Sequence, residues 1–362
     1  MNQDLPKPPG IKDIARAAGI SIGTVDRALR ARSGVSPTTR ARVLKIAEQL
    51  GYRPNIAARN LKLNRRLRIA AYLPREIASF FDPLRAGIRA AGAASLGTGV
   101  ELYFRTYPKL DDGDLELLET DIACKYDGII LALGNPNRVD SLLRRITRLG
   151  TVVVCVASDA PRSGRLASIS VDGFTSGAIA AELFARTLLN PGSVATITGE
   201  LTVLDHAEKL RGFAAGLAMM APHLALLPVL ESQKRPRDAY RQATELLSRK
   251  PRPLGLYIST INSTPIMRAL EEHNLLGQIK VITTDLFPEL VPLLEAGKIL
   301  ASLSQRPYTQ GKIAFETITG FLLEGRRPEA TTKLAPHIVL RSNLPQFVSR
   351  IVATQQTDAN AS

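Results

Sequence analysis

The chain is poor in the side chains that build metal centres and redox sites. Its 362 residues include no Trp, two Cys and four His. Cys124 and Cys155 lie far apart in the sequence and lack the spacing of a metal or redox pair. We expect both thiols to be reduced, Cys124 in a helix and Cys155 in a buried strand, and we predict no metal site and no cofactor.

Sequence motifs of common enzyme classes are also missing. Asp205 and His206 are neighbours, but no serine elbow or suitable cysteine accompanies them, which favours a His at the surface or at a pocket rim. There is no phosphate loop, and Ala71-Tyr-Leu-Pro-Arg-Glu occupies the place where a dinucleotide-binding glycine motif would follow the first strand. We predict that the protein is not an enzyme. The alternative, an α/β enzyme, would show turnover of a bound metabolite.

Signals for export or membrane insertion are absent as well. No stretch is long and apolar enough to span a membrane, and the basic, polar N-terminus has no apolar signal core. No repeat with a period of about 20–50 residues is present. We therefore expect a cytoplasmic protein with no membrane partner.

Positive charge is concentrated at one end of the chain. Residues 1–68 hold fifteen Lys and Arg against four Asp and Glu, a net charge of +11, whereas the whole chain is +14. The other 294 residues are therefore close to neutral. Basic charge confined to a small segment indicates binding to a phosphate backbone.

This basic segment has the pattern of a helix-turn-helix. Ile11, Ile14, Ala15 and Ala18 form one helix face, and Gly19-Ile20 ends that helix. Ser21 can cap the next helix, whose inward face is Val25, Ala28 and Leu29, and Ser36-Pro37 begins a third. A polar second helix after a short glycine turn is typical of a helix laid in the major groove. The alternative is an ordinary three-helix bundle with a solvated basic face.

The segment resembles the LacI family of bacterial transcription regulators. The resemblance rests on motifs in family order: Ile11-Lys-Asp-Ile-Ala, Ala18-Gly-Ile-Ser, Thr24-Val, Val35-Ser, Thr39-Arg, Leu50-Gly-Tyr-Arg-Pro-Asn and Ala58-Arg-Asn-Leu61. It implies a double-stranded DNA operator as partner, with residues 1–54 as the DNA-binding domain and 55–67 as a hinge helix and linker. The DNA contacts that it implies are Ser21, Ile22, Gly23, Thr24, Asp26, Arg27, Arg30, Asn55, Ala58, Arg59, Leu61 and Lys62.

Three of these residues have distinct implied roles. Arg27 can pair bidentately with guanine. Leu61 resembles the wedge that this family inserts into the minor groove, although it could also be a core residue of a connecting helix. Asp26 departs from the family, which has Ser there, and an acid could accept from cytosine or repel a phosphate. This departure leaves the operator sequence open.

The rest of the chain alternates strands and helices, which predicts parallel sheets covered by helices on both faces. The predicted strands are 68–73, 100–104, 128–133, 151–156, 168–171, 193–198, 226–230, 255–258, 279–284, 299–303 and 337–340. The predicted helices include 82–94, 140–149, 174–189, 209–219, 238–249, 265–274 and 307–324. The fold class is therefore α/β, with an all-α domain in front.

Residues 68–350 resemble the sugar-binding-protein fold of the ribose-type branch, which the LacI family uses as its sensor. The resemblance implies two lobes joined by three crossovers, lobe 1 about 68–171 and 306–333 and lobe 2 about 172–305 and 334–350. A ligand is implied between the lobes, at the carboxyl ends of the strands. Residues 351–362 are expected to be a disordered tail.

The resemblance also implies which residues line this ligand site: Phe80, Phe81, Ser158, Asp159, Lys209, Thr260, Asn262, Asp285 and Gln305. Phe80 and Phe81 match an aromatic pair that sandwiches a sugar ring. Ribose binders have Asp-Arg where this chain has Ala157-Ser158, so ribose itself is in doubt. For each polar residue alone, the alternative is a strand-end cap or a hydrogen bond between the lobes.

The implied function is a ligand-responsive regulator of transcription, a repressor of carbohydrate or polyol genes that a small-molecule effector, a sugar or polyol, releases from its operator. A corepressor-dependent regulator of another pathway is the alternative, and an unliganded architectural DNA binder would look similar. Reading a near-palindromic operator needs two copies, so we predict a homodimer. The tail after residue 350 is short and polar, without the heptads of tetrameric members.

Overall fold

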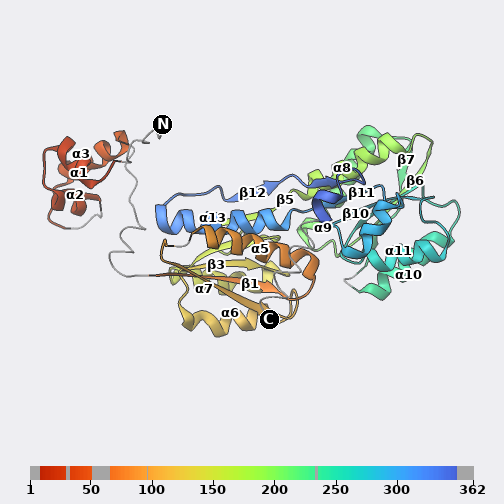
Figure 1. The fold of residues 1–362 in the computed structure, drawn as a ribbon, viewed down its shortest axis with the longest axis horizontal. Coiled ribbons are helices and arrows are strands. Elements are labelled where there is room, and N and C mark those ends of the chain that lie inside the picture. The colour runs from red at the N-terminus through yellow and green to blue at the C-terminus, as the bar shows by residue number, and fades with distance from the viewer. Residues whose placement is uncertain (1–8, 30–32, 51–65, 96, 233–234, 349–362) are drawn as a thin grey trace. The chain divides into compact units, whose positions relative to one another are not determined.

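The computed structural model describes residues 9–29, 33–50, 66–95, 97–232 and 235–348. Three helices form a small N-terminal unit, drawn in red in Figure 1: α1 (Ile11–Ala18), α2 (Ile22–Leu29) and α3 (Pro37–Gln49). Each helix contributes two side chains to one buried cluster: Ile14, Ala15, Val25, Ala28, Val43 and Ala47. The unit therefore has an apolar core of its own.

The caps of these helices fix the turn between them. Gly19 ends α1 in the left-handed region, with φ 65°, where a residue without Cβ is favoured. The hydroxyl of Ser21 accepts from the backbone N–H of Thr24 at 3.1 Å, and the hydroxyl of Ser36 accepts from Thr39 at 3.1 Å. The predicted helix-turn-helix and its caps are confirmed.

The first sheet of the larger unit has six strands in the order β12-β5-β4-β3-β1-β2, and every pair is parallel. Its strands are β1 (Leu67–Pro74), β2 (Val100–Tyr107), β3 (Gly128–Ala132), β4 (Val152–Val156), β5 (Ala167–Val171) and β12 (Thr331–Leu334). Its helices are α5 (Ala78–Ala94), α6 (Asp114–Asp121), α7 (Pro136–Arg148) and α13 (Pro307–Glu324). Figure 1 shows β12 beside β5.

The second sheet has the order β13-β11-β10-β9-β6-β7, with β8 also paired to β6. Its strands are β6 (Gly192–Thr198), β7 (Leu224–Leu226), β8 (Leu230–Glu231), β9 (Gly255–Ser259), β10 (Lys280–Thr284), β11 (Ala301–Ser304) and β13 (His337–Val339). Its helices are α8 (Gly173–Thr187), α9 (Leu204–Met220), α10 (Pro236–Ser248), α11 (Ser263–Glu272) and α12 (Val291–Glu295). Only β13 runs antiparallel among its described strands.

Side-chain alternation along β9 shows why this sheet is buried on both faces. Leu256 and Ile258 pack with α10 and α11, whereas Tyr257 between them packs with α8 and α9. Successive side chains of a strand point to opposite faces, so an entirely apolar strand needs a helix layer on each side. The predicted α/β class with parallel sheets is confirmed.

The chain passes between the two sheets three times. It leaves the first sheet after β5, returns through α13 to β12, and crosses again in the short step from β12 to β13. Gln305, just after β11, bonds Asp285 at the end of β10, and Gln310 bonds both Gln305 and Ala157 at the end of β4. The carboxyl ends of strands from both sheets are therefore linked here.

Several local expectations were wrong. The predicted strand 226–230 is two short strands, β7 and β8, because Pro228 between them has no N–H for a sheet ladder. Strand β12 was not predicted, because its sequence, Thr-Thr-Lys-Leu, is mostly polar and it lies half-exposed at the edge of the sheet. Cys124 ends a 3-10 turn, Ile122–Cys124, and is partly exposed, whereas Cys155 is buried in β4 as predicted. Both thiols are free.

Two helices of the first sheet approach each other closely through paired glycines. A Cβ at Gly87 of α5 would collide with the carbonyl oxygen of Tyr308, and a Cβ at Gly311 of α13 would collide with that of Leu84. The glycines therefore set the distance between α5 and α13.

No described helix is long and apolar enough to cross a membrane.

We predict opposite effects for two glycines of α13. Gly311→Ala should lower the free energy of unfolding by about 1–3 kcal/mol, because backbone rather than a flexible side chain blocks the new methyl group. Gly320→Ala meets only the end of Arg326 at 3.5 Å or more and should raise stability by about 0.5–1 kcal/mol. Urea unfolding of both variants gives the measurement, and equal effects would contradict this packing.

Candidate functional site

Helix α2 presents an exposed face in the N-terminal unit. Ile22 is 50% exposed although it is apolar, and Ser21, Gly23 and Arg27 are also exposed. Thr24 and Asp26 are half-buried. The remaining residues predicted to contact DNA lie outside the described residues: Arg30, Asn55, Ala58, Arg59, Leu61 and Lys62.

The guanidinium of Arg27 is held along this face. Its Nε donates to the carbonyl oxygen of Gly23 one turn earlier, at 3.2 Å. A guanidinium anchored through Nε keeps its terminal N–H groups for a second partner, which is the geometry that bidentate pairing with a base needs. The hydroxyl of Ser21 caps α2 and shares a hydrogen bond with Thr24 at 2.9 Å, so both side chains hold the start of the helix.

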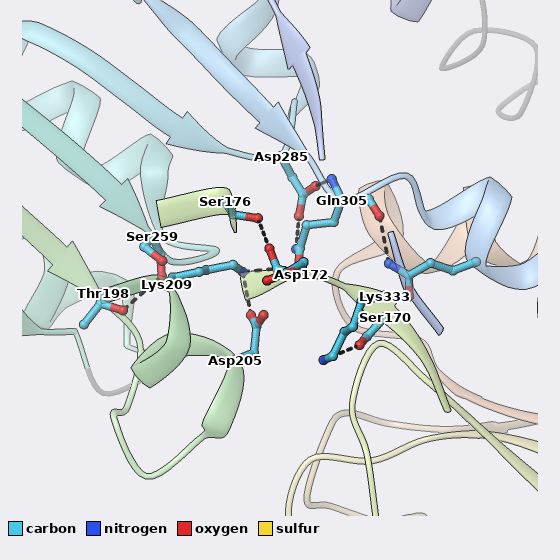
Figure 2. Close-up of polar contacts among 11 residues, drawn as sticks. Ser170, Asp172, Ser176, Thr198, Asp205, Lys209, Ser259, Asp285, Gln305 and Lys333 are labelled. Atoms are coloured by element: carbon cyan, nitrogen blue, oxygen red, sulfur yellow. Dashed lines mark hydrogen bonds and ion pairs between the residues drawn. The ribbon is translucent and has the colours of Figure 1, made fainter. Parts of the chain in front are cut away.

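A polar cluster lies at the carboxyl ends of the second sheet (Figure 2). Lys209 of α9 is 2% exposed, and its Nζ lies 2.5 Å from Asp205 Oδ2 and 3.2 Å from Gln305 Oε1. Gln305, just after β11, donates its backbone N–H to Asp285 Oδ1 at 2.9 Å and its side-chain amide to Oδ2 at 2.5 Å. Lys209, Asp285 and Gln305 were each predicted from the sequence, and the fold brings them together.

The charges of the cluster depend on one another. Burial is the largest single effect on the pKa of Lys209 and lowers it. The charge and hydrogen bond of Asp205, together with Tyr257 and Asp285, raise it, so the net shift is upward and the amine stays charged. Burial raises the pKa of Asp285, against the hydrogen bonds from Gln305 and the charge of Lys209. A buried cation is thus retained because a carboxylate touches it.

Three non-glycine residues near this cluster have left-handed backbones: Ala157 (φ 63°), Asp285 (φ 60°) and Arg306 (φ 58°). They follow β4, β10 and β11 respectively. Such conformations are costly for residues with a Cβ and are found where surrounding contacts enforce them, often at ligand sites. Here they turn the chain sharply at the strand ends.

The other predicted polar residues occupy strand ends in the same way. Ser158 Oγ accepts from the N–H of Leu133 at 3.0 Å, and Thr260 Oγ1 lies 3.1 Å from Ser232 Oγ. Asn262 is 5% exposed, and its Nδ2 has no hydrogen-bond partner among the described residues. A buried amide donor of this kind is ready to bind an oxygen of a ligand or water.

For three predicted ligand residues the structure shows contacts within the protein. Asp159 is held by Arg165 through both carboxylate oxygens, one contact being 2.6 Å, so the pair carries no net charge. Phe80 and Phe81 lie in the first turn of α5, and their rings pack edge to face with centroids 5.0 Å apart. Both rings are buried, 7% and 2% exposed, so a sugar cannot lie between them in this arrangement.

Sequence reasoning missed two residues of the site. Asp205 was considered only with His206, although its spacing of four from Lys209 is the usual signal of a helical ion pair. Gln310 of α13 is fully buried, accepts from the N–H of Ala157 at 3.1 Å and donates to the carbonyl oxygen of Gln305 at 2.8 Å. No sequence pattern distinguishes it from a surface glutamine at a helix start.

The described residues hold no group of three or more His, Cys, Asp and Glu placed for a metal ion. What the cluster offers is a buried ammonium, two carboxyl groups and amides on rigid strand ends. Such groups donate to and accept from hydroxyls, which suits binding of a polar small molecule.

Comparison with known proteins agrees with both parts of the chain. Residues 10–55 match "Bacterial regulatory proteins, lacI family", and residues 69–325 match "Periplasmic binding protein domain". The chain belongs to the LacI family. The protein is a ligand-responsive DNA-binding regulator. Its DNA-binding domain implies operator DNA as a partner, and its periplasmic-binding-protein domain implies a small-molecule effector.

Individual relatives support the family assignment over most of the chain. The ribose operon repressor of Bacillus subtilis is 28% identical over 338 residues, 90% of this chain and 94% of that protein. Catabolite control protein A of Priestia megaterium is 25% identical over 255 residues, 69% and 73% of the two chains. A glucose-galactose binding protein from Geobacillus stearothermophilus shares the fold, with TM-score 0.70 and 23% identity over 78% of this chain and 99% of that one. The two relatives found by sequence, catabolite control protein A and the ribose operon repressor, are regulators of transcription.

We predict that Gln310→Leu destabilises this LacI-family chain by about 1–3 kcal/mol, because it leaves the buried N–H of Ala157 and the carbonyl oxygen of Gln305 without these bonds. Urea unfolding measures the loss. Gln278→Leu, at an exposed position, is the control and should change stability by less than about 0.5 kcal/mol. Equal behaviour of the two variants would show that the Gln310 bonds do not matter.

Proposed function

We propose that this LacI-family regulator is a cytoplasmic, homodimeric repressor of carbohydrate or polyol genes, and that an effector of this class releases it from a near-palindromic operator. The observation that carries the proposal is the buried cluster of Lys209, Gln305 and Asp285. Its donors and acceptors suit a compound rich in hydroxyls. The resemblance adds Phe80 and Phe81 as the aromatic residues nearest to a sugar ring.

The DNA side of the proposal rests on α2. Ile22 and Arg27 are exposed, and Arg27 keeps its terminal N–H groups for guanine. Gly23 offers no side chain, so direct readout there should be poor. Leu61 is assigned to the minor groove by the resemblance, where it would unstack a base step and kink the duplex.

Linkage explains how the effector acts. An effector that binds one arrangement of the sensor more tightly shifts the population toward it, typically by about 1–3 kcal/mol of coupling. If that arrangement does not hold the hinge segments together over the operator, DNA is released. A corepressor would favour the opposite arrangement, so the sign of the response decides between induction and corepression.

The experiment that tests the proposal has two readouts on the intact chain. A thermal-shift screen of monosaccharides and polyols should find a compound that stabilises the protein by about 2.7 kcal/mol at about 100 times its dissociation constant. The same compound should then lower affinity for an operator duplex selected from random DNA. Tighter DNA binding instead would identify a corepressor, and no stabilisation by any compound would contradict a carbohydrate effector.

We predict that two substitutions separate the two activities. Arg27→Ala should cost about 1–3 kcal/mol on the selected operator and relax preference at one base pair, because it removes a bidentate contact. Effector-induced stabilisation should be unchanged. Fluorescence anisotropy on operator and random duplexes gives the measurement, and equal losses on both would exclude a base-reading role.

The complementary change is Asp285→Asn. It keeps the shape of the side chain but loses a charged acceptor, and a hydrogen bond to a charged group is worth roughly 1.5–3 kcal/mol. Effector affinity should therefore fall about tenfold or more, while operator affinity without effector is retained. Calorimetry with the effector from the screen measures this loss. An unchanged affinity would place the effector elsewhere.

We predict a dimer at micromolar concentration, because two DNA-binding domains related by a two-fold axis are needed to read two half-sites. Light scattering of the purified chain tests this directly. A stable tetramer, or a monomer that binds its operator tightly, would contradict the prediction.

A further inference from the structure

In the polar cluster, the cation Lys209 is paired with a carboxylate of its own helix, that of Asp205. Lys209 and Asp205 lie one turn apart on α9, with Nζ 2.5 Å from Oδ2. The side chain of Lys209 is 2% exposed, and that of Asp205 is 28% exposed. A buried ammonium cannot use water to disperse its charge, so its energy depends on the carboxylate that touches it.

The electrostatic neighbours of Lys209 leave no surplus of positive charge. Two carboxyl groups, those of Asp205 and Asp285, raise the pKa of Lys209. Asp205 contacts the amine directly, whereas Asp285 is linked to it through the side chain of Gln305. With Asp285 ionised the three groups sum to one negative charge, and with Asp285 protonated they sum to zero. Neither state offers a cation that an anionic ligand could neutralise.

Other cations at these strand ends have partners of their own, but of different kinds. Arg165 is bound by both oxygens of Asp159, whereas Lys333 of β12 donates to the neutral hydroxyl of Ser170 at 2.9 Å and Arg306 donates to the carbonyl oxygen of Ala335 at 3.4 Å. Figure 2 shows Lys333 turned to Ser170 rather than to Lys209. An anion entering the cluster would lose its hydration and meet two carboxyl groups.

An uncharged polyhydroxy compound fits the same groups well. Its hydroxyls can donate to the carboxylates of Asp205 and Asp285. Its oxygens can accept from Asn262 Nδ2, which has no partner among the described residues, and from the third N–H of Lys209, since two are used by Asp205 and Gln305. The carboxylates, the amide of Asn262 and the third N–H of Lys209 then all have partners, and the net charge of the cluster is unchanged.

We propose that Asp205 is a specificity-determining residue: by neutralising Lys209 it restricts the effector to uncharged polyhydroxy compounds and excludes their phosphate esters and acids. This inference rests on the proposed function, since it concerns the effector of the same site. It assigns to Asp205 a role in selecting the ligand in addition to its role in stabilising a buried charge.

The first experiment compares matched ligands on the intact wild-type chain. Each neutral sugar or polyol of the panel is measured beside its own phosphate ester and carboxylic acid by calorimetry. The neutral compound should bind about tenfold or more tightly than its charged partners. Tighter binding of a phosphate or acid would overturn the inference but leave a carbohydrate effector intact, whereas absence of binding in any form would count against the proposed function.

The second experiment uses inorganic phosphate as the probe and needs no effector. Asp205→Asn removes the carboxylate that touches Lys209 and raises the net charge of the cluster by one. Phosphate, compared with chloride at equal ionic strength, should therefore raise the melting temperature of this variant more than that of the wild type. The wild type should show only the general stabilisation that phosphate gives to folded proteins. The matched control is Glu208→Gln on the same helix, whose carboxylate pairs with the exposed Arg211, and it should behave as the wild type.

A double variant separates selection from folding. Asp205→Asn combined with Lys209→Met removes both charges, so it should fold even where Asp205→Asn alone is too unstable. Phosphate should stabilise it no more than the wild type. If phosphate stabilises the wild type and the double variant as much as Asp205→Asn, the cation that receives it is not Lys209, and the inference is wrong.

Discussion

The compensated charge of Lys209 is the interaction on which the proposed effector site depends. The amine is buried, it lies against the carboxylate of Asp205, and it donates a hydrogen bond to the side-chain oxygen of Gln305. Gln305 in turn donates to Asp285 from both its backbone N–H and its side-chain amide. One buried cation therefore orients Gln305 and, through it, Asp285, the two residues proposed to bind the effector.

Helix packing holds this cation in place from behind. A Cβ at Gly177 of α8 would collide with the carbonyl oxygen of Lys209, and one at Gly212 of α9 would collide with that of Phe174. The two backbones therefore lie closer than side chains would allow, which sets the depth of Lys209 below the strand ends. The same device joins α5 to α13 through Gly87 and Gly311, so the helices that flank both sheets are positioned by missing side chains.

The sequence was sufficient wherever local pattern and fold agree. Helix 307–324 was predicted from the alternation of strands and helices. Asp285 and Gln305 were implied by the family resemblance, which also places the ligand at the carboxyl ends of the strands. Partners between distant segments could not be found in this way. Asp159 was expected to bind a ligand hydroxyl, and the structure pairs it with Arg165. Gln310 bonds Ala157, which lies 153 positions away in the sequence. Such pairs depend on how the segments come together, which no local pattern contains.

Gln310 connects the proposed ligand site at the second sheet to the end of β4 in the first sheet. It accepts from Ala157 at the end of β4 and donates to Gln305, the residue that also bonds Lys209 and Asp285. Ala157 is held with φ 63°, an unfavourable conformation that its surroundings must enforce. A ligand that takes over the bonds of Gln305 thus acts on a residue tied to the first sheet.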